Sequence, residues 1–416
     1  MSGPRARITL QAGAVLLALF VGLQLTRPEL SNPPVLADLA APEAVKSILV
    51  AACYDCHSNQ TRLRWFDRLA PAAWLVARDV RAGREHLNFS DIGVLPLAKQ
   101  RSRLYESLNQ IKLGAMPPRA YRSLHPESVL TAEQIAVLER YLHGPDPVLP
   151  ATLAQVAAAK EQYLNWLAEG PTKPPVRPSP NGIGYMPEYK DWQVLSSTDR
   201  FDDHRFRVIL GNEVAARAAL ANQVRPWPDG SVLAKVSWDE LANPDGSVHM
   251  GEFRQVAFMI KDHRKHAATQ GWGYAQWMGT KLEPYGKNAE FSGECTGCHE
   301  PMRAHDFVFT VPVAATSVPR AWRLITSAVH PQDGTMSQLY GNEVAVGHAR
   351  RVGPGPYPPG AALSRVVWRQ REDPNWFGGR IPGKVESVDV VTVAKRSSNE
   401  DVRAQPLLEA RASVMP

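Results

Sequence analysis

The amino-acid sequence predicts a multidomain α+β protein: a helical domain, then a domain of β character, then a degenerate repeat of that second domain. Three observations lead to this prediction. Apolar residues recur with a helical period between about residues 43 and 145, and short β-branched or alternating runs dominate residues 188–315. Several short motifs of the second region return 130 positions later. A length of 416 residues also exceeds one ordinary domain.

The composition is that of a globular protein, with 44% hydrophobic and 21% charged residues. The formal net charge of +6 is modest, and the basic residues are spread along the chain. We therefore expect no nucleic-acid partner. An acidic redox partner protein or an anionic membrane surface agrees with the sign of the charge.

Residues 1–30 predict a membrane anchor. Arg5 and Arg7 precede an apolar stretch from about Ile8 to Leu25, which as a helix is roughly 27 Å long and close to the thickness of a hydrocarbon core. The flanking charges predict a single anchor in a bacterial inner membrane, with the soluble part in the periplasm. A cleaved signal peptide is the alternative; no small-x-small cleavage site directly follows Leu25, and the rest of the chain is exported in either case.

All four cysteines belong to two copies of one five-residue motif. The copies are Cys53-Tyr54-Asp55-Cys56-His57 and Cys295-Thr296-Gly297-Cys298-His299. Two intervening residues place both sulfurs within one helical turn, where they can bond the two vinyl groups of one haem, and the histidine that follows supplies the proximal iron ligand. We expect two covalently bound haem c groups.

Three other interpretations explain the cysteines less well. A structural zinc site would need ligands from two pairs that are far apart in sequence. Two disulfides would not explain why a histidine follows each second cysteine. A thioredoxin-like redox pair could account for one motif but hardly for both.

The first domain, residues 43–145, is predicted to be helical. Helices are expected from Ala44 to Cys53, from Pro71 onward, and from the N-cap Thr131 to about Leu142. Met116 follows His57 on a proline-stiffened loop.

A methionine sulfur is a common sixth ligand of haem iron, so Met116 is the candidate distal ligand. A gap-filling role for this methionine is the alternative. His86 and His125 are rival ligands.

Residues in a fixed order connect this domain to a known family. They are Cys53 to Asn59, Trp65-Phe66, Ala70-Pro71, Trp74-Leu75, Gly83-Arg84, Leu87 to Ser90, Met116 to Tyr121, and His125. This set resembles the bacterial haem-binding domain family of single-haem cytochromes. The resemblance implies an all-α fold with His57 as proximal ligand, and it supports Met116 as distal ligand.

A Pro-rich connector with one helix, residues 146–187, is predicted to separate the two haem domains. The second domain, residues 188–315, follows it. Its predicted strands are 206–210, 231–238, 255–260 and 307–311. A turn is predicted at 227–230, and an insertion between Trp238 and Phe253.

Residues 318–400 are predicted to be a partial copy of this domain. Pairs of identical residues or motifs lie 130 positions apart: Trp192 and Trp322, Gly211 to Ala215 and Gly341 to Ala345, Gly230 and Gly360, and Trp238 and Trp368. The copy has no Cys-x-x-Cys-His motif, so we expect no covalent haem there. Our hypothesis is that it packs on its parent as an internal pseudo-dimer partner.

A second family resemblance rests on the order of Trp192, Gly211-Asn212, Pro228-Asp229-Gly230, Lys235, Gly271 to Tyr274, and Cys295 to His299. Residues 188–315 resemble the cytochrome P-460 family with its cytochrome c′-β relatives. The resemblance implies an antiparallel sheet with flanking helices, commonly dimeric, and a five-coordinate haem with His299 as proximal ligand. It also implies hydroxylamine oxidation or nitric oxide binding at the open iron position.

Two side chains would distinguish these activities. Catalytic members of the family cross-link a lysine to the haem edge, and Lys235 matches that lysine; its counterpart in the copy is Arg365. Glu290, with Glu294 behind it, is the candidate distal carboxylate that accepts protons from hydroxylamine. The alternatives are an outward-pointing strand lysine and surface glutamates.

We expect a membrane-anchored dihaem cytochrome. Its second haem would oxidise hydroxylamine or bind a small nitrogen oxide, and its first haem would relay electrons to a redox partner. One alternative is a nitric oxide sensor or scavenger without turnover. The other is a simple electron-transfer cytochrome, in which Met302 or His305 closes the second iron.

Overall fold

The computed structural model describes residues 4–143, 151–168, 176–313, 318–351, 356–394 and 410–411. Its contacts divide the chain into two compact units, residues 1–145 and 146–416. Parts of the predicted connector (146–150 and 169–175) and of the predicted repeat (352–355 and 395–400) lie outside the described residues.

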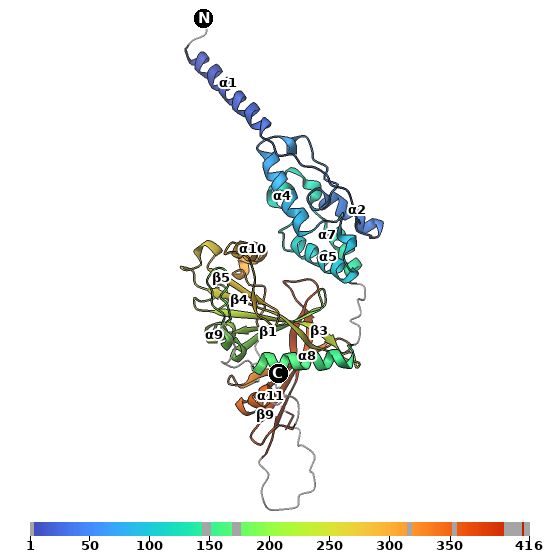
Figure 1. Ribbon diagram of the computed structural model, residues 1–416, viewed down its shortest axis with the longest axis vertical. Coiled ribbons are helices and arrows are strands. Elements are labelled where there is room, and N and C mark those ends of the chain that lie inside the picture. The colour runs from blue at the N-terminus through green and yellow to red at the C-terminus, as the bar shows by residue number, and fades with distance from the viewer. Residues whose placement is uncertain are drawn as a thin grey trace, which may run out of the picture. The chain divides into compact units, whose positions relative to one another are not determined.

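The first unit is helical (Figure 1). Its helices are α1 (Pro4–Leu25), α2 (Glu43–Ala52), α3 (Tyr54–His57), α4 (Ala72–His86), α5 (Leu97–Lys112), α6 (Arg119–Leu124) and α7 (Ala132–Leu142). Short 3₁₀ turns cover Phe66–Arg68, Ile92–Val94 and Pro126–Ser128. The three predicted helices match α2, α4 and α7, and Thr131 forms the capping box that opens α7.

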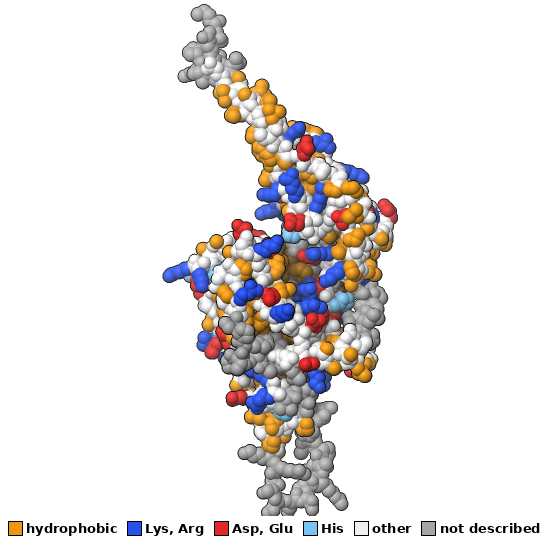
Figure 2. All heavy atoms as spheres, viewed as in Figure 1, with side chains coloured by type: hydrophobic (Ala, Val, Ile, Leu, Met, Phe, Trp, Pro, Cys, Tyr) orange, Lys and Arg blue, Asp and Glu red, His pale blue; other side chains and the backbone are white. Residues whose placement is uncertain are grey.

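Helix α1 presents apolar side chains to solvent along its described part, from Val15 to Leu25 (Figure 2). The side-chain amide of Gln24 ties its end to the backbone of Ala70, through an Oε1 contact of 3.0 Å and an Nε2 contact of 3.3 Å. Within the described part of the chain, no helix combines the length and the apolarity needed to cross a membrane.

The second unit is an antiparallel barrel with flanking helices (Figure 1). Its strands are β1 (Gln193–Arg200), β2 (Arg205–Gly211), β3 (Val232–Ala242), β4 (Val248–Lys261), β5 (Trp272–Met278), β6 (Glu283–Pro284), β7 (Arg323–His330), β8 (Thr335–Gly341), β9 (Ala362–Glu372), β10 (Arg380–Thr392) and β11 (Ala410–Arg411). Its helices are α8 (Leu153–Ala168), α9 (Glu213–Leu220), α10 (Phe291–His299) and α11 (Glu343–Arg351), with 3₁₀ turns at Pro187–Asp191, Ala267–Thr269 and Glu300–His305.

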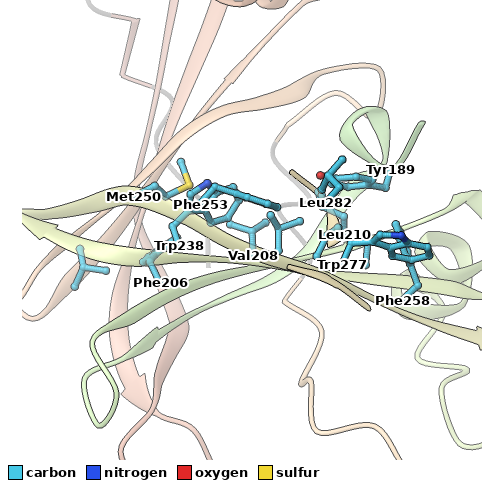
Figure 3. Packing of buried hydrophobic residues seen from close by; sticks show 14 of the residues in the cluster. Tyr189, Phe206, Val208, Leu210, Trp238, Met250, Phe253, Phe258, Trp277 and Leu282 are labelled. Carbon is cyan, nitrogen blue, oxygen red and sulfur yellow. The ribbon is translucent and has the colours of Figure 1, made fainter. Parts of the chain in front are cut away.

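The strand order is β3-β2-β1-β10-β9-β8-β7-β4-β5-β6, and β3 also pairs with β4, which closes the ring. The segment predicted as an insertion is the far end of the β3–β4 hairpin, because Trp238 and Phe253 are cross-strand partners. Trp238 belongs to a buried cluster on one face of this sheet, together with Phe206 and Val208 (Figure 3). Side chains of the opposite face form a second cluster that includes Cys295.

Strands β1, β2 and β3 have counterparts β7, β8 and β9, each 130 residues later. Local contacts repeat as well. Asn212 Oδ1 accepts from the backbone N–H of Ala215 at 3.0 Å, and Asn342 Oδ1 accepts from that of Ala345 at the same distance. Identical helix caps at equivalent positions are what a duplicated sequence would produce.

The prediction of a strand at 307–311 is wrong. Asp306 and Phe307 have positive backbone φ angles of 51° and 64°, and the chain from there to residue 313 is irregular. Two consecutive left-handed residues turn the backbone and prevent a strand from starting at Phe307.

Candidate haem sites

The first cysteine motif forms a tight helical turn between α2 and α3. The backbone N–H groups of Cys56 and His57 both donate to the carbonyl of Cys53, at 3.2 and 2.9 Å. The two sulfurs therefore lie within one turn, as the haem interpretation requires. Burial raises the pKa of both thiols, Cys53 and Cys56, to about 12. A thioredoxin-like pair would instead carry a thiol of lowered pKa.

The ring of His57 is held by the end of α4. Its Nδ1 lies 2.9 Å from the carbonyl oxygen of Gly83 and 3.1 Å from that of Leu87. Burial lowers the pKa of His57, which favours the neutral ring. With its proton on Nδ1, the ring offers Nε2 as a metal ligand, which is the usual arrangement for an axial histidine.

Gly83 lets α4 approach the motif closely. A Cβ atom at this position would lie 2.6 Å from the backbone oxygen of Cys56. Any larger residue would push α4 away from the motif, and the carbonyl groups that orient His57 would move with it.

Met116 lies on the loop between α5 and α6, and 38% of its surface is exposed. Helix α6, which follows it, is tied to the motif because the hydroxyl group of Tyr121 donates to Asp55 Oδ2 at 2.9 Å. The assignment of Met116 as distal ligand remains a prediction.

The two rival histidines have other surroundings. His125 is buried, its Nε2 lies 3.1 Å from Asp67 Oδ1, and its ring stacks on Tyr121 at 4.0 Å. His86 is exposed at the end of α4. The ring of His125 thus contributes to packing and to a buried hydrogen-bond contact with Asp67 within this domain.

The second motif lies on α10. Nδ1 of His299 is 2.6 Å from the carbonyl oxygen of Phe307, so Nε2 is again the nitrogen left for iron. Burial, with a contribution from the charge of Lys235, lowers the pKa of His299 to about 4. The neutral ring is therefore favoured at physiological pH.

A clamp formed by distant residues fixes the carbonyl group of Phe307. Lys261 Nζ lies 2.7 Å from Asp306 Oδ1, and both side chains are largely buried. The backbone N–H of Trp227 donates to Asp306 Oδ2 at 2.9 Å, and the indole N–H of Trp272 donates to the Asp306 carbonyl oxygen at 2.8 Å. These contacts hold the left-handed turn in place.

Lys235 lies on β3, where its ammonium group interacts electrostatically with Cys295, Cys298 and His299. Burial, followed by the positive charge of Arg207, lowers the pKa of Lys235 to about 8. Among the residues that the structure describes, Lys235 has no hydrogen-bond or ion-pair partner. The structure thus brings an unpaired amine into the neighbourhood of the second motif.

Glu290 lies at the start of α10 and is exposed, with its Oε2 3.4 Å from Asn288 Nδ2. Glu294 is also exposed and accepts from the hydroxyl group of Tyr285 at 3.1 Å. Within the described residues, neither carboxylate is hydrogen-bonded to Lys235 or His299. The structure does not bring Glu290 together with Lys235, and its catalytic role remains a prediction.

The surroundings of the second motif fit a large, mostly apolar group. Cys295 packs against an apolar cluster whose members include Leu195, Ile209 and Leu233. Tyr274 lies beside His299, with ring centres 5.4 Å apart. Its hydroxyl group is buried and has no hydrogen-bond partner in the described part of the chain.

Residues of the repeat also reach this site. The ring of Trp376 packs against Phe309 with centres 5.8 Å apart, and Phe309 packs against His299 at 5.1 Å. Asn375 Nδ2 donates to the carbonyl oxygen of Phe309 at 2.6 Å. Sequence reasoning did not identify Phe309, Trp376 or the Lys261–Asp306 clamp, because only tertiary contacts bring them to the motif.

Two histidines that each direct Nδ1 to a backbone carbonyl group, each next to a pair of cysteines on one helical turn, define a haem-binding cytochrome. Comparison with family models agrees with this class. Residues 14–144 match the haem-binding domain, and residues 186–310 match cytochrome P460. The chain thus carries a haem-binding domain followed by a cytochrome P460 domain. No curated protein gives a significant match to it.

Proposed function

We propose that this protein is a membrane-anchored dihaem c-type cytochrome. Its cytochrome P460 domain oxidises hydroxylamine or binds a small nitrogen oxide, and its N-terminal haem relays electrons to a redox partner protein. Haem, when bound, supplies a redox-active iron with a position open to a small ligand. The observation that carries the proposal is the unpaired, half-buried amine of Lys235 beside Cys295, Cys298 and His299.

The residues have separate roles in this proposal. Cys53 and Cys56 hold the first haem with His57 and Met116 as iron ligands. Cys295 and Cys298 hold the second, and His299 supplies its proximal nitrogen. Because burial and Arg207 lower the pKa of Lys235 to about 8, a useful fraction of its amine is neutral near that pH. A neutral amine, unlike an ammonium group, has a lone pair that it could direct toward the haem edge.

The first test is an absorption spectrum of the dithionite-reduced protein. A broad red-shifted band beside an ordinary c-type α-band supports the lysine cross-link and makes oxidation the leading function. Hydroxylamine-dependent reduction of an acceptor is then compared in the wild type, in Lys235→Met and in the exposed control Lys281→Met. If Lys235→Met behaves like the control, the enzymatic proposal is wrong.

Nitric oxide binding without turnover is the second candidate. The exposure of Glu290 favours it, because oxidation of hydroxylamine needs a proton acceptor at the site. A spectrum with two ordinary c-type signatures and tight nitric oxide binding would support this function. Carbon monoxide distinguishes both candidates from a simple electron carrier, because an iron closed by Met302 or His305 would not bind it.

We also propose that α1 anchors the protein in the inner membrane and that the soluble part lies in the periplasm. The apolar side chains of α1 support this, since Leu16, Leu17 and Leu19 are each more than half exposed. Carbonate extraction of cell membranes tests it: the full chain should stay in the pellet, and a Leu16→Glu/Leu19→Glu variant should be released.

We further propose that the repeat acts as an internal pseudo-dimer partner. Asp199 of β1 pairs with Arg380 of β10, and Val248 of β4 pairs with Val329 of β7. The start of β4, in the first copy, thus pairs with β7, the first strand of the second copy. The start of β10, in the second copy, pairs in the same way with β1, the first strand of the first copy. Such reciprocal contacts resemble a two-fold dimer interface within one chain. Light scattering of the detergent-solubilised protein tests whether a separate homodimer also forms.

A further inference from the structure

Arg207 lies on the same face of the sheet as Lys235. In the β2–β3 pairing, Ile209 stands opposite Lys235 and Arg207 stands opposite Ser237. Arg207 is therefore the diagonal neighbour of Lys235, within reach of a long side chain. The face that they share is the one whose cluster contains Cys295, Ile209 and the other residues around the second motif.

Lys235 connects this face to the second motif. Its ammonium group interacts electrostatically with Cys295 and Cys298 and also with Arg207 and Arg200. The strand register places Arg207 two residues along β2 from Ile209, the residue opposite Lys235. A haem bonded to these cysteines through its vinyl groups would carry its propionates on the opposite edge.

The two arginines differ in how fully their donors are used. Arg200 donates to both oxygens of Asp202, from Nε at 2.6 Å and from Nη2 at 2.5 Å. Arg207 has one end-on contact, from Nη2 to Asp203 Oδ2 at 3.2 Å. Its Nε atom is buried and has no hydrogen-bond partner within the described residues.

The protein therefore keeps a guanidinium group that is only partly satisfied. Burial and the neighbouring charge of Arg200 lower the pKa of Arg207 to about 10, so the group is cationic at neutral pH. A buried donor without a partner is costly, by about 1–3 kcal/mol. Such a donor is well suited to an oxyanion, because guanidinium groups bind carboxylates and similar anions through two parallel hydrogen bonds.

We propose that Arg207 binds an oxyanion at the second haem site. Two sources share this chemistry: a propionate carboxylate of the haem, or a small free anion such as nitrite. The inference rests on the proposed function to the extent that the second motif carries haem, and it adds a binding residue that neither family resemblance assigned.

The test uses the full-length holoprotein with Arg207→Gln and the matched control Arg205→Gln. Arg205 lies on the same face, also contacts Asp203 (3.7 Å), and is one step further from Lys235. Nitrite is titrated into the ferric protein and followed by the Soret band. Resonance Raman spectra report the bending modes of the haem propionates. Arg207→Lys is a second variant that keeps the charge if the glutamine variant does not fold.

If nitrite is the ligand, Arg207→Gln weakens its binding by about tenfold or more, and the propionate bands keep their positions. If a propionate is the ligand, those bands shift and nitrite affinity stays within about twofold. Arg205→Gln changes neither. The proposal is overturned if holoprotein with Arg207→Gln or Arg207→Lys matches the control in both measurements. A chain that carries no haem at Cys295 and Cys298 would instead refute the proposed function.

Discussion

The two histidine sites reach the same geometry by different routes. In the first unit, the last turn of α4 offers two carbonyl groups to His57, and a glycine lets that helix approach the motif. In the second unit, one carbonyl group orients His299, and it belongs to a left-handed turn that Lys261 holds through Asp306. A local helix end serves one site, and a long-range ion pair serves the other.

This difference predicts where each site is vulnerable. The first depends on close packing between two neighbouring helices. The second depends on a buried charge pair whose partners are far apart in sequence and come from β4 and from the turn after α10. Removing a partner should therefore have its largest effect in the second unit.

Lys261→Ala should have the largest effect. It leaves the Asp306 carboxylate buried without its cation, which costs about 3–5 kcal/mol. Unfolding of the full chain in urea, followed by hydrogen exchange of peptides from β4 and β5, should show the loss in the second unit. The reduction potential of the second haem should shift as well. Arg217→Ala, which breaks an exposed pair with Glu213 on α9, is the control and should have little effect. Equal losses in the two variants would show that the clamp has no special role.

Gly83→Ala should have a smaller effect, confined to the first unit. The added methyl group would meet the Cys56 carbonyl oxygen, and overpacking of this kind costs about 1–3 kcal/mol. We expect faster hydrogen exchange in α3 and α4 and an altered axial-ligand signal of the first haem in electron paramagnetic resonance. Gly293→Ala on α10 is the matched control, since its added methyl group has nothing within 4 Å. An unaltered first haem in Gly83→Ala would refute the packing argument.

The smallest effect concerns pH. Burial raises the pKa of Glu240 from 4.5 to about 7, and the pKa of its buried neighbour Asp199 is raised by burial and by Glu240. The folded state thus holds a proton more tightly than the unfolded chain. The resulting stability is fully present below about pH 4.5 and is lost as the pH rises through 7. Protection factors of the β3 amides, which correct for the intrinsic rise of exchange with pH, should therefore fall over this range.

Glu240→Gln should remove part of that pH dependence. The first unit supplies an internal comparison with the opposite sign. There, burial acts to raise the pKa of Asp38, but hydrogen bonds from Lys46 and Tyr54 lower it by more. The contribution of Asp38 to the stability of the folded state is therefore lost as the pH falls. If Glu240→Gln leaves the pH profile of the β3 peptides unchanged, the buried carboxyl pair is not its source.

The sequence was informative where the signal is local. The two five-residue motifs, the helix cap at Thr131 and the repeat at an interval of 130 residues can be read without knowledge of tertiary structure. Helix α5 was not predicted, although Leu104 and Leu108 form part of its buried face. The positions of β7, β8 and β9 could be predicted only from the interval of 130 residues that separates them from β1, β2 and β3.

The parts of the site that depend on strand register could not be predicted in this way. Arg207 alternates with Phe206 and Val208, which shows that it faces away from them, but only the pairing of β2 with β3 places it beside Lys235. Asp306 and Phe307 followed a motif and preceded β-branched residues, so the segment was expected to be a strand. Positive φ angles at residues other than glycine depend on tertiary contacts such as the Lys261 ion pair.

In the described part of the chain, the two strand pairings that join the repeats are no longer alike. One joins Asp199 to Arg380, and the other joins Val248 to Val329. In a dimer of identical chains, every substitution at such an interface appears twice, so a change that suits one end is imposed on the other. Covalent fusion removes that constraint, and an acidic and a basic residue can face each other at one junction while two valines face each other at the other. A chain with two such junctions can accept mutations one at a time, which identical subunits cannot do.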